Sequence, residues 1–451
     1  MPTNSVSLYE RLRHIESLDV YEDRKKIGTL NRKVISGVSA CEFVPDLNEQ
    51  GKPIPNGVYN KKSLQTQNRM QLPPYFSNLL PEGLRRQTIE SLMGVPAGIN
   101  DDFVLLAALG SDCIGNICVT RPNNGSVAQA KISLSFDEAN TLETEGKEDL
   151  KLFIAKHLHL QKGVALTGMQ DKVSAFCGTT RLRIHSTGSE STVRETYFIV
   201  KTENEEMPNL TDNESFFMEL GKKCGLNVPN FLSVTLDDGD KVFLVERFDR
   251  AAPDTDSDDQ KTIKIHVEDA LQVMNSMSEE KFNGSWDELS KRILTKVDNV
   301  QQVQATQDLF RLYFYSYVVG NGDLHSKNIS LWTNPESGNV EVAPIYDLTS
   351  LVFYRTDEGG VDESMALPLN KKVNNFSVED FTKYAQSIGL EVEDAQRIMG
   401  EVSRTVAQEI GSLDLPDIEP YDMTNGIEII NHRCEQFIDL GLSRSPNPPS
   451  L

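Results

Sequence analysis

The sequence lacks the cysteine and histidine patterns that bind metals or form disulfide frameworks. Its six cysteines are Cys41, Cys113, Cys118, Cys177, Cys224 and Cys434. They are scattered through 451 residues, with no Cys-x-x-Cys pair and no histidine cluster beside them. This spacing argues against a zinc site and against a small disulfide-stabilised fold. We therefore expect buried free thiols in a reducing compartment.

Long apolar runs and excess basic charge are also missing. No stretch approaches the ~18 apolar residues that a membrane-spanning helix requires, and the amino terminus shows no apolar signal core. The 45 lysine and arginine residues are outnumbered by 67 aspartate and glutamate residues, which gives a net charge of −22. Such a surface repels nucleic acid phosphates, so DNA binding is not expected without a basic partner. We expect a globular cytoplasmic protein with no membrane contact.

The length and the patterning of the chain predict three parts. With 38% hydrophobic residues, the chain can bury more than one core. Residues 1–125 are predicted to form a mixed α/β accessory subdomain, because a buried helix at 102–110 precedes a strand at 116–120 and a turn-rich boundary. Residues 126–260 are rich in strand patterns, and residues 261–451 are mostly helical.

One short stretch, residues 322–328 (GDLHSKN), has the most distinctive chemistry. An aspartate followed five positions later by an asparagine is the arrangement that phosphoryl transfer uses. Asp323 would orient an acceptor hydroxyl, and the amide of Asn328 would hold Mg²⁺. A hairpin through 329–347 would bring Asp347 back beside Asn328 and complete a two-ligand metal site. By itself the stretch leaves protein and small-molecule acceptors equally open.

Two upstream patterns are compatible with phosphate contacts, and each also has a simpler explanation. A loop with two glycines at 163–172 precedes strands predicted at 173–177 and 181–185. Its N–H groups suit phosphate oxygens, although an ordinary hairpin loop is the simpler interpretation. The strand at 197–201 ends in Lys201, which either extends to solvent or binds the α and β phosphates of ATP.

Two later patterns have similar alternatives. Thr211 and Glu214 have the spacing of a capping box that opens a helix, but a kinase also keeps the partner of its lysine on the helix after the lysine strand. A strand at 241–246 then ends in a charged cluster. This is either an ordinary strand end or a hinge, in which backbone groups of Glu246 and Phe248 pair with an adenine edge.

Taken in order, the motifs resemble those of the HipA family of serine/threonine protein kinases, the toxin halves of bacterial toxin–antitoxin pairs. The fragments that carry the resemblance are Ser77–Pro81, Gly168–Lys172, Asn213-Glu214, Gly225–Pro229, Glu246–Arg250, Gly322–Asn328 and Tyr346-Asp347. The resemblance implies an α+β fold of the two-lobed protein-kinase type. It also implies a mixed α/β amino-terminal accessory subdomain and a mainly helical carboxyl-terminal lobe.

The resemblance also implies a set of site residues. Asp323 would be the catalytic base, and Asn328 and Asp347 the Mg²⁺ ligands. The residues implied to bind ATP are Thr167, Gly168, Met169, Gln170, Asp171, Lys172, Lys201, Glu246, Arg247, Phe248, His325, Ser326, Lys327 and Tyr346. Among them, residues 167–172 would form the phosphate-side loop and residues 246–248 the adenine hinge.

Partners and regulation are implied in the same way. Family members phosphorylate a protein, with an aminoacyl-tRNA synthetase as the best-known substrate type, and so halt translation and growth. A small DNA-binding antitoxin of the HipB type holds them and represses its own operon, so contact with DNA is indirect. In this chain Ala165 stands where members usually carry a serine whose autophosphorylation silences the kinase. That substitution puts self-inactivation by this route in question.

Two other functions stay open. The 322–328 stretch also resembles the loops of aminoglycoside and choline phosphotransferases, whose acceptors are small molecules. The Gly168–Lys172 loop and the accessory subdomain favour the protein kinase over this alternative. The second alternative is a non-catalytic partner of a DNA-binding antitoxin. Retention of the lysine, the base and both metal-binding positions argues against binding as the sole role.

Overall fold

The computed structural model describes most of the chain, which divides into two compact units. The described residues are 6–35, 38–54, 56–65, 71–122, 133–136, 142–144, 172–177, 180–183, 190–193, 196–203, 206–235, 241–251 and 263–442. One unit, which we call the sheet unit, comprises Met1–Thr202 and Asn230–Glu280. The other, the helical unit, comprises Glu203–Pro229 and Lys281–Leu451. The chain therefore passes between the two units three times.

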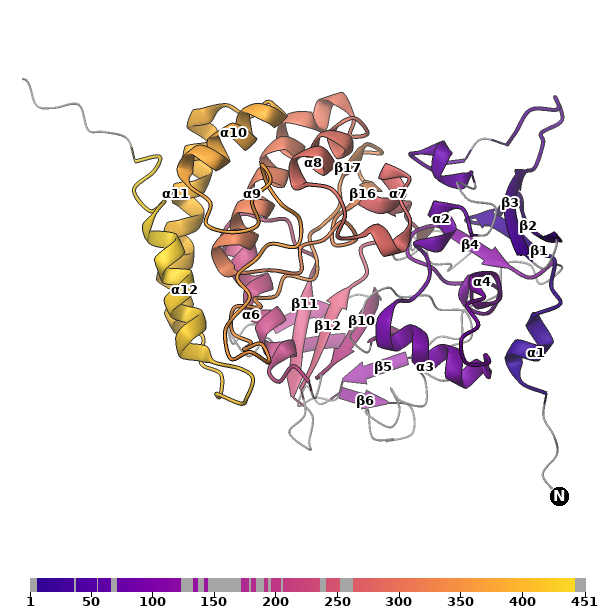
Figure 1. The fold of residues 1–451 in the computed structure, drawn as a ribbon, viewed down its shortest axis with the longest axis horizontal. Coiled ribbons are helices and arrows are strands. Elements are labelled where there is room, and N and C mark those ends of the chain that lie inside the picture. The colour runs from indigo at the N-terminus through magenta and orange to yellow at the C-terminus, as the bar shows by residue number, and fades with distance from the viewer. Residues whose placement is uncertain are drawn as a thin grey trace, which may run out of the picture. The chain divides into compact units, whose positions relative to one another are not determined.

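An antiparallel four-stranded sheet forms the amino-terminal part of the sheet unit, with strand order β3-β2-β1-β4 (Figure 1). Its elements are α1 (Leu8–Leu12), β1 (Ser17–Glu22), β2 (Lys25–Ile35), β3 (Val38–Pro45), a 3-10 turn (Lys61–Leu64), α2 (Pro74–Ser77), α3 (Gly83–Met93), α4 (Asp102–Leu109) and β4 (Ile117–Thr120). Leu18 and Val20 of β1 and Leu106 of α4 are fully buried in one core. Asp101 caps α4 and Gly110 ends it, which confirms the predicted helix.

A six-stranded sheet forms the second part of the sheet unit, in the order β11-β12-β10-β7-β5-β6. Its strands are β5 (Ser133–Phe136), β6 (Leu142–Thr144), β7 (Lys172–Cys177), β10 (Thr196–Thr202), β11 (Phe231–Thr235) and β12 (Lys241–Glu246). Shorter elements are β8 (Thr180–Arg183), β9 (Glu190–Val193), β13 (Arg250–Ala251), β14 (Ile263–Lys264), β15 (Val267–Asp269), α7 (Ala270–Met274) and a 3-10 turn (Ser278–Glu280). Figure 1 shows β10, β12 and β11 side by side.

The pairing of β7 corrects one sequence prediction. The strands at 173–177 and 181–185 were expected to form a hairpin, but β7 pairs with β10 on one edge and β5 on the other. β8 pairs instead with β9. β10 is buried on both faces, at Tyr197, Phe198 and Val200, so it belongs inside a sheet. Its pairing with β7 occupies the edge that a local hairpin would have used.

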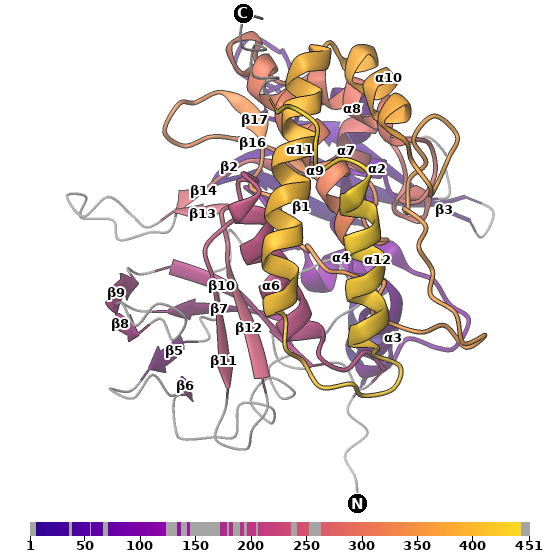
Figure 2. The same ribbon diagram turned by 90° about the vertical axis from the view of Figure 1, so that its left-hand side faces the viewer.

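The helical unit is built around the helix α9. It also contains a small hairpin, formed by β16 and β17. Its elements are α6 (Leu210–Lys223), α8 (Trp286–Leu294), a 3-10 turn (Asn299–Gln301), α9 (Gln302–Val319), β16 (Ser330–Thr333), β17 (Val340–Val342), α10 (Val378–Ile388), α11 (Val392–Glu409), a 3-10 turn (Ile410–Ser412) and α12 (Met423–Glu435). Figure 2 shows α11 and α12 side by side. In the sequence, residues 304–319 carry apolar side chains at helical spacing, which predicts a buried helix, and α9 confirms it.

Aromatic side chains from α8, α9 and α10 make the core of the helical unit. Trp286 stacks on Tyr313, with ring centroids 5.1 Å apart, and Phe310 stacks on Tyr384 at 5.6 Å. The indole N–H of Trp286 donates to the Tyr384 hydroxyl at 2.8 Å, so the polar atoms of these large rings are paired. Because nearly every face of α9 meets such side chains, the helix provides a rigid support for the residues that follow it.

The start of α6 decides against one of the two interpretations of Thr211 and Glu214. The capping box is wrong, because the helix begins at Leu210, with Asn209 as its N-cap. Thr211 therefore lies inside the first turn. Its N–H and its hydroxyl both donate to the carboxylate of Glu203. A carboxylate from outside the helix thus satisfies the N–H that the capping box would have bound.

The cysteines have the state expected from the sequence. Cys41, Cys113, Cys118, Cys224 and Cys434, the cysteines within the described ranges, are buried free thiols. Burial raises the pKa of Cys41, Cys113, Cys224 and Cys434 to about 12. These thiols are therefore unreactive at neutral pH.

Among the helices within the described ranges, none has the length and apolar character needed to cross a membrane.

Two helix-ending glycines give a matched test of packing at the end of α9. Gly320 and Gly389 both have left-handed backbones, with φ of +73° and +81°. A Cβ at Gly320 would lie 2.4 Å from a Val352 methyl carbon, whereas nothing lies within 4 Å of one at Gly389. We expect Gly389→Ala to lower the free energy of unfolding by about 1–2 kcal/mol and Gly320→Ala by a further ~1–3 kcal/mol. Urea denaturation measures both, and equal losses would contradict the steric argument.

Candidate active site

The predicted catalytic loop follows α9 directly and is closed by its own asparagine. Gly320 ends the helix, and the N–H of Asn321 donates to the carbonyl of Ser316 at 2.8 Å. The side-chain amide of Asn328 donates to the carbonyl of Asp323 at 2.8 Å. The two residues that were predicted to act on substrate and metal are therefore held at the two ends of one turn.

The Asp323 carboxylate is the exposed group of this turn. Its side chain is 46% exposed, whereas that of His325 is 8% exposed, and Ser326, Lys327 and Asn328 are buried residues. The N–H of Lys327 donates to Nδ1 of His325 at 3.3 Å, which assigns the ring proton to Nε2. That nitrogen lies 3.8 Å from Oδ1 of Asp323. An imidazole nitrogen thus lies close to the exposed carboxylate, at a separation longer than a hydrogen bond.

The hairpin of β16 and β17 returns the chain to this loop, as predicted. The Tyr346 hydroxyl donates to the carbonyl of Lys327 at 2.9 Å and pairs with the Ser330 hydroxyl at 2.7 Å. Tyr346 precedes Asp347 in the chain, and Lys327 precedes Asn328. The stretch that carries Asp347 is therefore tied to the stretch that carries Asn328.

The oxygen atoms of Asn328 and Asp347 suit Mg²⁺. Because the Asn328 amide nitrogen binds the carbonyl of Asp323, its amide oxygen is the atom left to face a cation. Mg²⁺ is usually held by one or two such protein oxygens, together with water and substrate phosphates. Within the described ranges, no three His, Cys, Asp or Glu side chains are grouped to hold a metal. Asn328 and Asp347 therefore stay the predicted ligands.

Lys201 lies in the sheet unit, at the end of β10, opposite Lys172 of β7 and Phe243 of β12. It is only 4% exposed, so the interpretation that its ammonium extends to solvent is wrong. Its neighbours Phe198 and Val200 in β10 are buried as well. A buried ammonium requires an anionic or polar partner.

The predicted hinge lies at the end of β12, and part of its backbone is already engaged. The N–H of Glu246 donates to the carbonyl of Asn230 at 2.8 Å, and that of Arg247 to the carbonyl of Tyr197 at 2.7 Å. Recognition of an adenine edge by this stretch would therefore use carbonyl oxygens or Phe248, which is half-buried. The adenine hinge stays a prediction, and the N–H groups of Glu246 and Arg247 are not available for it.

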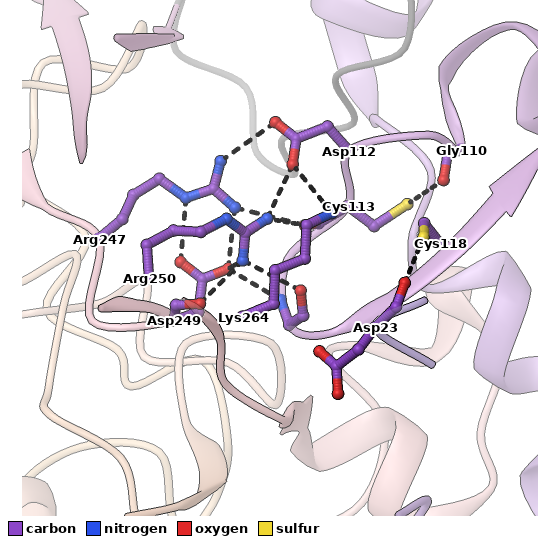
Figure 3. Close-up of polar contacts among 10 residues, drawn as sticks. Asp23, Gly110, Asp112, Cys113, Cys118, Arg247, Asp249, Arg250 and Lys264 are labelled. Atoms are coloured by element: carbon purple, nitrogen blue, oxygen red, sulfur yellow. Dashed lines mark hydrogen bonds and ion pairs between the residues drawn. The ribbon is translucent and has the colours of Figure 1, made fainter. Parts of the chain in front are cut away.

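The side chain of Arg247 is fully buried in a cluster of ion pairs (Figure 3). It donates to both oxygens of Asp249, at 2.9 and 2.8 Å, and its Nη1 lies 3.6 Å from Asp112. Arg250 joins the same two carboxylates, each at 2.7 Å. The Arg247 side chain is therefore committed to this cluster, and only its backbone remains a candidate for contact with a nucleotide.

The cluster connects the hinge to the accessory part of the sheet unit. Asp112 lies in the turn between α4 and β4, and the N–H of Gly115 in that turn donates to Asp249 at 2.8 Å. Burial alone would raise the pKa of both aspartates, but the two arginines outweigh it and hold each pKa below its usual range. Sequence reasoning missed Asp112 because its partner Arg250 lies 138 positions away, and no local pattern reaches that far.

Several predicted site residues lie outside the described residues. These are Thr167, Gly168, Met169, Gln170 and Asp171, together with Ala165. Lys172 begins β7, and only its backbone is described. Ser326, by contrast, is fully buried, and its hydroxyl has no hydrogen-bond partner among the residues that the structure describes.

Comparison with known proteins decides the family. The HipA-like C-terminal domain matches residues 164–410, and the HipA N-terminal domain matches residues 18–120. The chain belongs to the HipA family. This HipA-family chain is 23% identical over 445 residues to the serine/threonine-protein kinase toxin HipA of Shewanella oneidensis, covering 94% of this chain and 96% of the relative. It is 25% identical to the putative kinase Y4mE of Sinorhizobium fredii, covering 82% and 84%.

A solved structure has the same fold as this HipA-family chain. It is the complex of HipA, HipB and operator DNA from Shewanella oneidensis MR-1, with a TM-score of 0.65 and 21% identity, covering 93% of this chain and 97% of that chain. The predicted family and the α+β kinase-like fold are confirmed. The individual site residues and the division at residues 125 and 260 stay predictions.

The charge cluster gives a test of stability against pH. Asp249→Asn leaves two buried arginine charges short of a partner, so we expect the free energy of unfolding at neutral pH to fall by about 3–5 kcal/mol. The pKa of Asp249 lies below its ordinary value of 3.8 in the folded chain. The stability that it contributes is therefore complete above that value and is lost as pH falls through the folded pKa. Urea denaturation from neutral pH down to about pH 3 follows both effects.

A surface ion pair provides the control. Asp394 binds Arg397 at 2.9 Å, with both side chains more than 40% exposed. We expect Asp394→Asn to change the free energy of unfolding by less than ~1 kcal/mol. Equal losses for the two variants, or a loss for Asp249→Asn that does not shrink in acid, would contradict the proposed role of the buried cluster.

Proposed function

We propose that this protein is a serine/threonine protein kinase that uses Mg²⁺ and ATP, with Asp323 as its catalytic base. The observation that carries the proposal is the turn closed by Asn328, which puts an exposed carboxylate and a metal-type amide oxygen five positions apart. Membership of the HipA family supports it. So does the relative from Shewanella oneidensis, which is named a serine/threonine-protein kinase toxin.

In the helical unit, each residue has a distinct part in the proposed transfer. Asp323 accepts a hydrogen bond from the acceptor hydroxyl and takes its proton as the oxygen attacks phosphorus. The imidazole of His325, whose Nε2 lies 3.8 Å from that carboxylate, is a polar neighbour of its charge. The amide oxygen of Asn328 and the carboxylate of Asp347 would hold Mg²⁺. ATP, when bound, would supply the γ-phosphoryl group, and ADP would leave as the bond between the γ-phosphorus and the bridging oxygen breaks.

The sheet unit is assigned the remaining nucleotide contacts. Lys201 binds phosphate oxygens, since a lysine with 4% exposure at the end of β10 has the charge and burial for that role. The carbonyl oxygens at 246–248 and the ring of Phe248 contact the adenine. In the 167–172 loop, backbone N–H groups and Lys172 contact phosphates, while the residues from His325 to Lys327 and Tyr346 support the nucleotide from the catalytic loop.

Replacement of the base gives the direct test. We expect Asp323→Asn to lower the turnover number by roughly 10²–10⁴-fold, because the amide no longer accepts the hydroxyl proton. ATP binding, measured by calorimetry, should survive because the proposed metal ligands and Lys201 are intact. Asp357→Asn, which changes an exposed aspartate, is the control and should retain full activity. Undiminished transfer by Asp323→Asn would refute the assignment of the base.

The nature of the acceptor separates two enzyme classes. A protein, such as an aminoacyl-tRNA synthetase, is the acceptor that we propose, because the HipA N-terminal domain at 18–120 accompanies the kinase-like part. In a cell lysate with labelled γ-phosphate, the wild type should label protein bands that Asp323→Asn does not label. Rapid transfer to an amino alcohol or an aminoglycoside, with none to protein, would establish a small-molecule phosphotransferase instead.

We also propose that a small, basic DNA-binding antitoxin binds this kinase in the cytoplasm. The net charge of −22 suits a basic partner, and the HipA of Shewanella oneidensis MR-1 has been solved in a complex with HipB and operator DNA. In a gel-shift assay at physiological salt, this chain alone should leave DNA of its own operon unshifted. It should supershift the same DNA once the antitoxin is added. Binding of DNA by the chain alone would contradict the proposal.

A further inference from the structure

Asn213 of α6 binds the backbone three residues after the proposed metal ligand Asp347. Its amide nitrogen donates to the carbonyl of Ser350 at 3.0 Å, and its amide oxygen accepts from the N–H of Ser350 at 2.8 Å. Asn213 and Ser350 are both fully buried. The carboxamide thus makes the pair of hydrogen bonds that a neighbouring strand would make. Because both residues are buried, these two bonds fix the orientation of the carboxamide relative to the backbone of Ser350.

Two further contacts join α6 and its following loop to the same stretch of chain. A Cβ at Gly221 would lie 2.9 Å from Cδ1 of Leu348, the residue directly after Asp347, so the missing side chain allows the helix to approach closely. The N–H of Ile345 donates to the carbonyl of Asn227 at 2.7 Å. We call these three contacts, at Asn213, Gly221 and Asn227, the α6 bracket.

The other side of this stretch is fixed to the end of α9. The hydroxyl of Ser350 donates to the carbonyl of Val319, and the N–H of Leu351 donates to the carbonyl of Gly320 at 2.9 Å. Val319 and Gly320 are the residues that lead into the catalytic loop. Ser350 therefore connects the α6 bracket to the support of Asp323.

The backbone of Asp347 adopts an unfavourable conformation, which requires support from its neighbours. Its φ is +54°, in the left-handed region, where a residue other than glycine is held at a cost of about 1 kcal/mol or more. Such a conformation persists where the surrounding contacts determine it. The contacts at Ile345, Leu348 and Ser350 enclose Asp347 on both sides along the chain.

We propose that Asn213 is a positioning residue for the metal site and that the α6 bracket sets the direction of the Asp347 carboxylate toward Mg²⁺. This role rests on the proposed kinase function and adds a residue that acts through Asp347. Mg²⁺ requires a nearly octahedral arrangement of oxygens at about 2.0–2.1 Å, so a small shift of one carboxylate weakens the site. Loss of a residue that orients a metal ligand typically lowers metal affinity or activity by ~10- to 100-fold.

The test replaces Asn213 with leucine, which keeps the volume and removes both hydrogen bonds. Calorimetry measures ATP binding with and without Mg²⁺. We expect Asn213→Leu to raise the Mg²⁺ concentration for half-maximal binding and transfer by ~10- to 100-fold, with metal-free ATP binding unchanged. Hydrogen exchange supplies a readout that needs no nucleotide: the amide of Ser350 should exchange faster in the variant. Glu219→Leu, at an exposed position of α6, should match the wild type in every measurement.

Each outcome has a defined meaning. A folded Asn213→Leu protein with wild-type dependence on Mg²⁺ overturns the positioning role, whereas a wild type without Mg²⁺-dependent transfer overturns the proposed function itself. If Asn213→Leu does not fold, Asn213→Ser decides. It also removes the pair of hydrogen bonds to the backbone of Ser350, but its polar side chain leaves space for water, and we expect a shift in Mg²⁺ dependence of the same sign. An unchanged Mg²⁺ dependence in Asn213→Ser then overturns the inference.

Discussion

A buried cluster of opposite charges joins the accessory part of the sheet unit to the strand that ends at the proposed hinge, and the placement of that hinge depends on it. Asp112 comes from the turn between α4 and β4, whereas Arg247, Asp249 and Arg250 follow β12. Any one of these charges would be unfavourable to bury alone, but together they satisfy one another. Because paired guanidinium and carboxylate groups are directional, the cluster permits one arrangement of the two parts. The apolar cores drive burial; the charges determine which surfaces meet.

The helical unit uses a different means of fixing its reactive loop. Aromatic rings surround α9 on nearly every face, so the helix end at Gly320 is a stable reference point. From that point, the carbonyls of Val319 and Gly320 hold the Asp347 stretch, and the side chain of Asn328 closes the catalytic turn. The proposed base and both proposed metal ligands are therefore positioned by contacts with the same helix end. A loop that is mostly buried, with only Asp323 well exposed, follows from this arrangement.

The sequence predicted those elements whose determinants are local. The periodicity of α4 and α9, the lysine strand β10 and the hairpin of β16 and β17 all depend on residues within about one element of each other, which is the range of pattern rules. An error arose where a more distant segment replaced the neighbouring one, as when β10 rather than β8 paired with β7. Asp112 and Asn213 received no role because Arg250 and Ser350 lie 138 and 137 positions from them. Motif spacing indicated the chemistry of the loop at 322–328, but it carries no information about such pairs.

The pairing of Asn213 with Ser350 also has a consequence for the order in which the protein is made. During synthesis α6 leaves the ribosome long before its partner, since 137 residues separate the two sides of the hydrogen-bonded pair. Closing so long a loop is slow, and contacts of this kind form late in folding. The proposed metal site is therefore completed only after residue 350 has emerged, so a chain that stops short of it has the motifs but not the assembled centre.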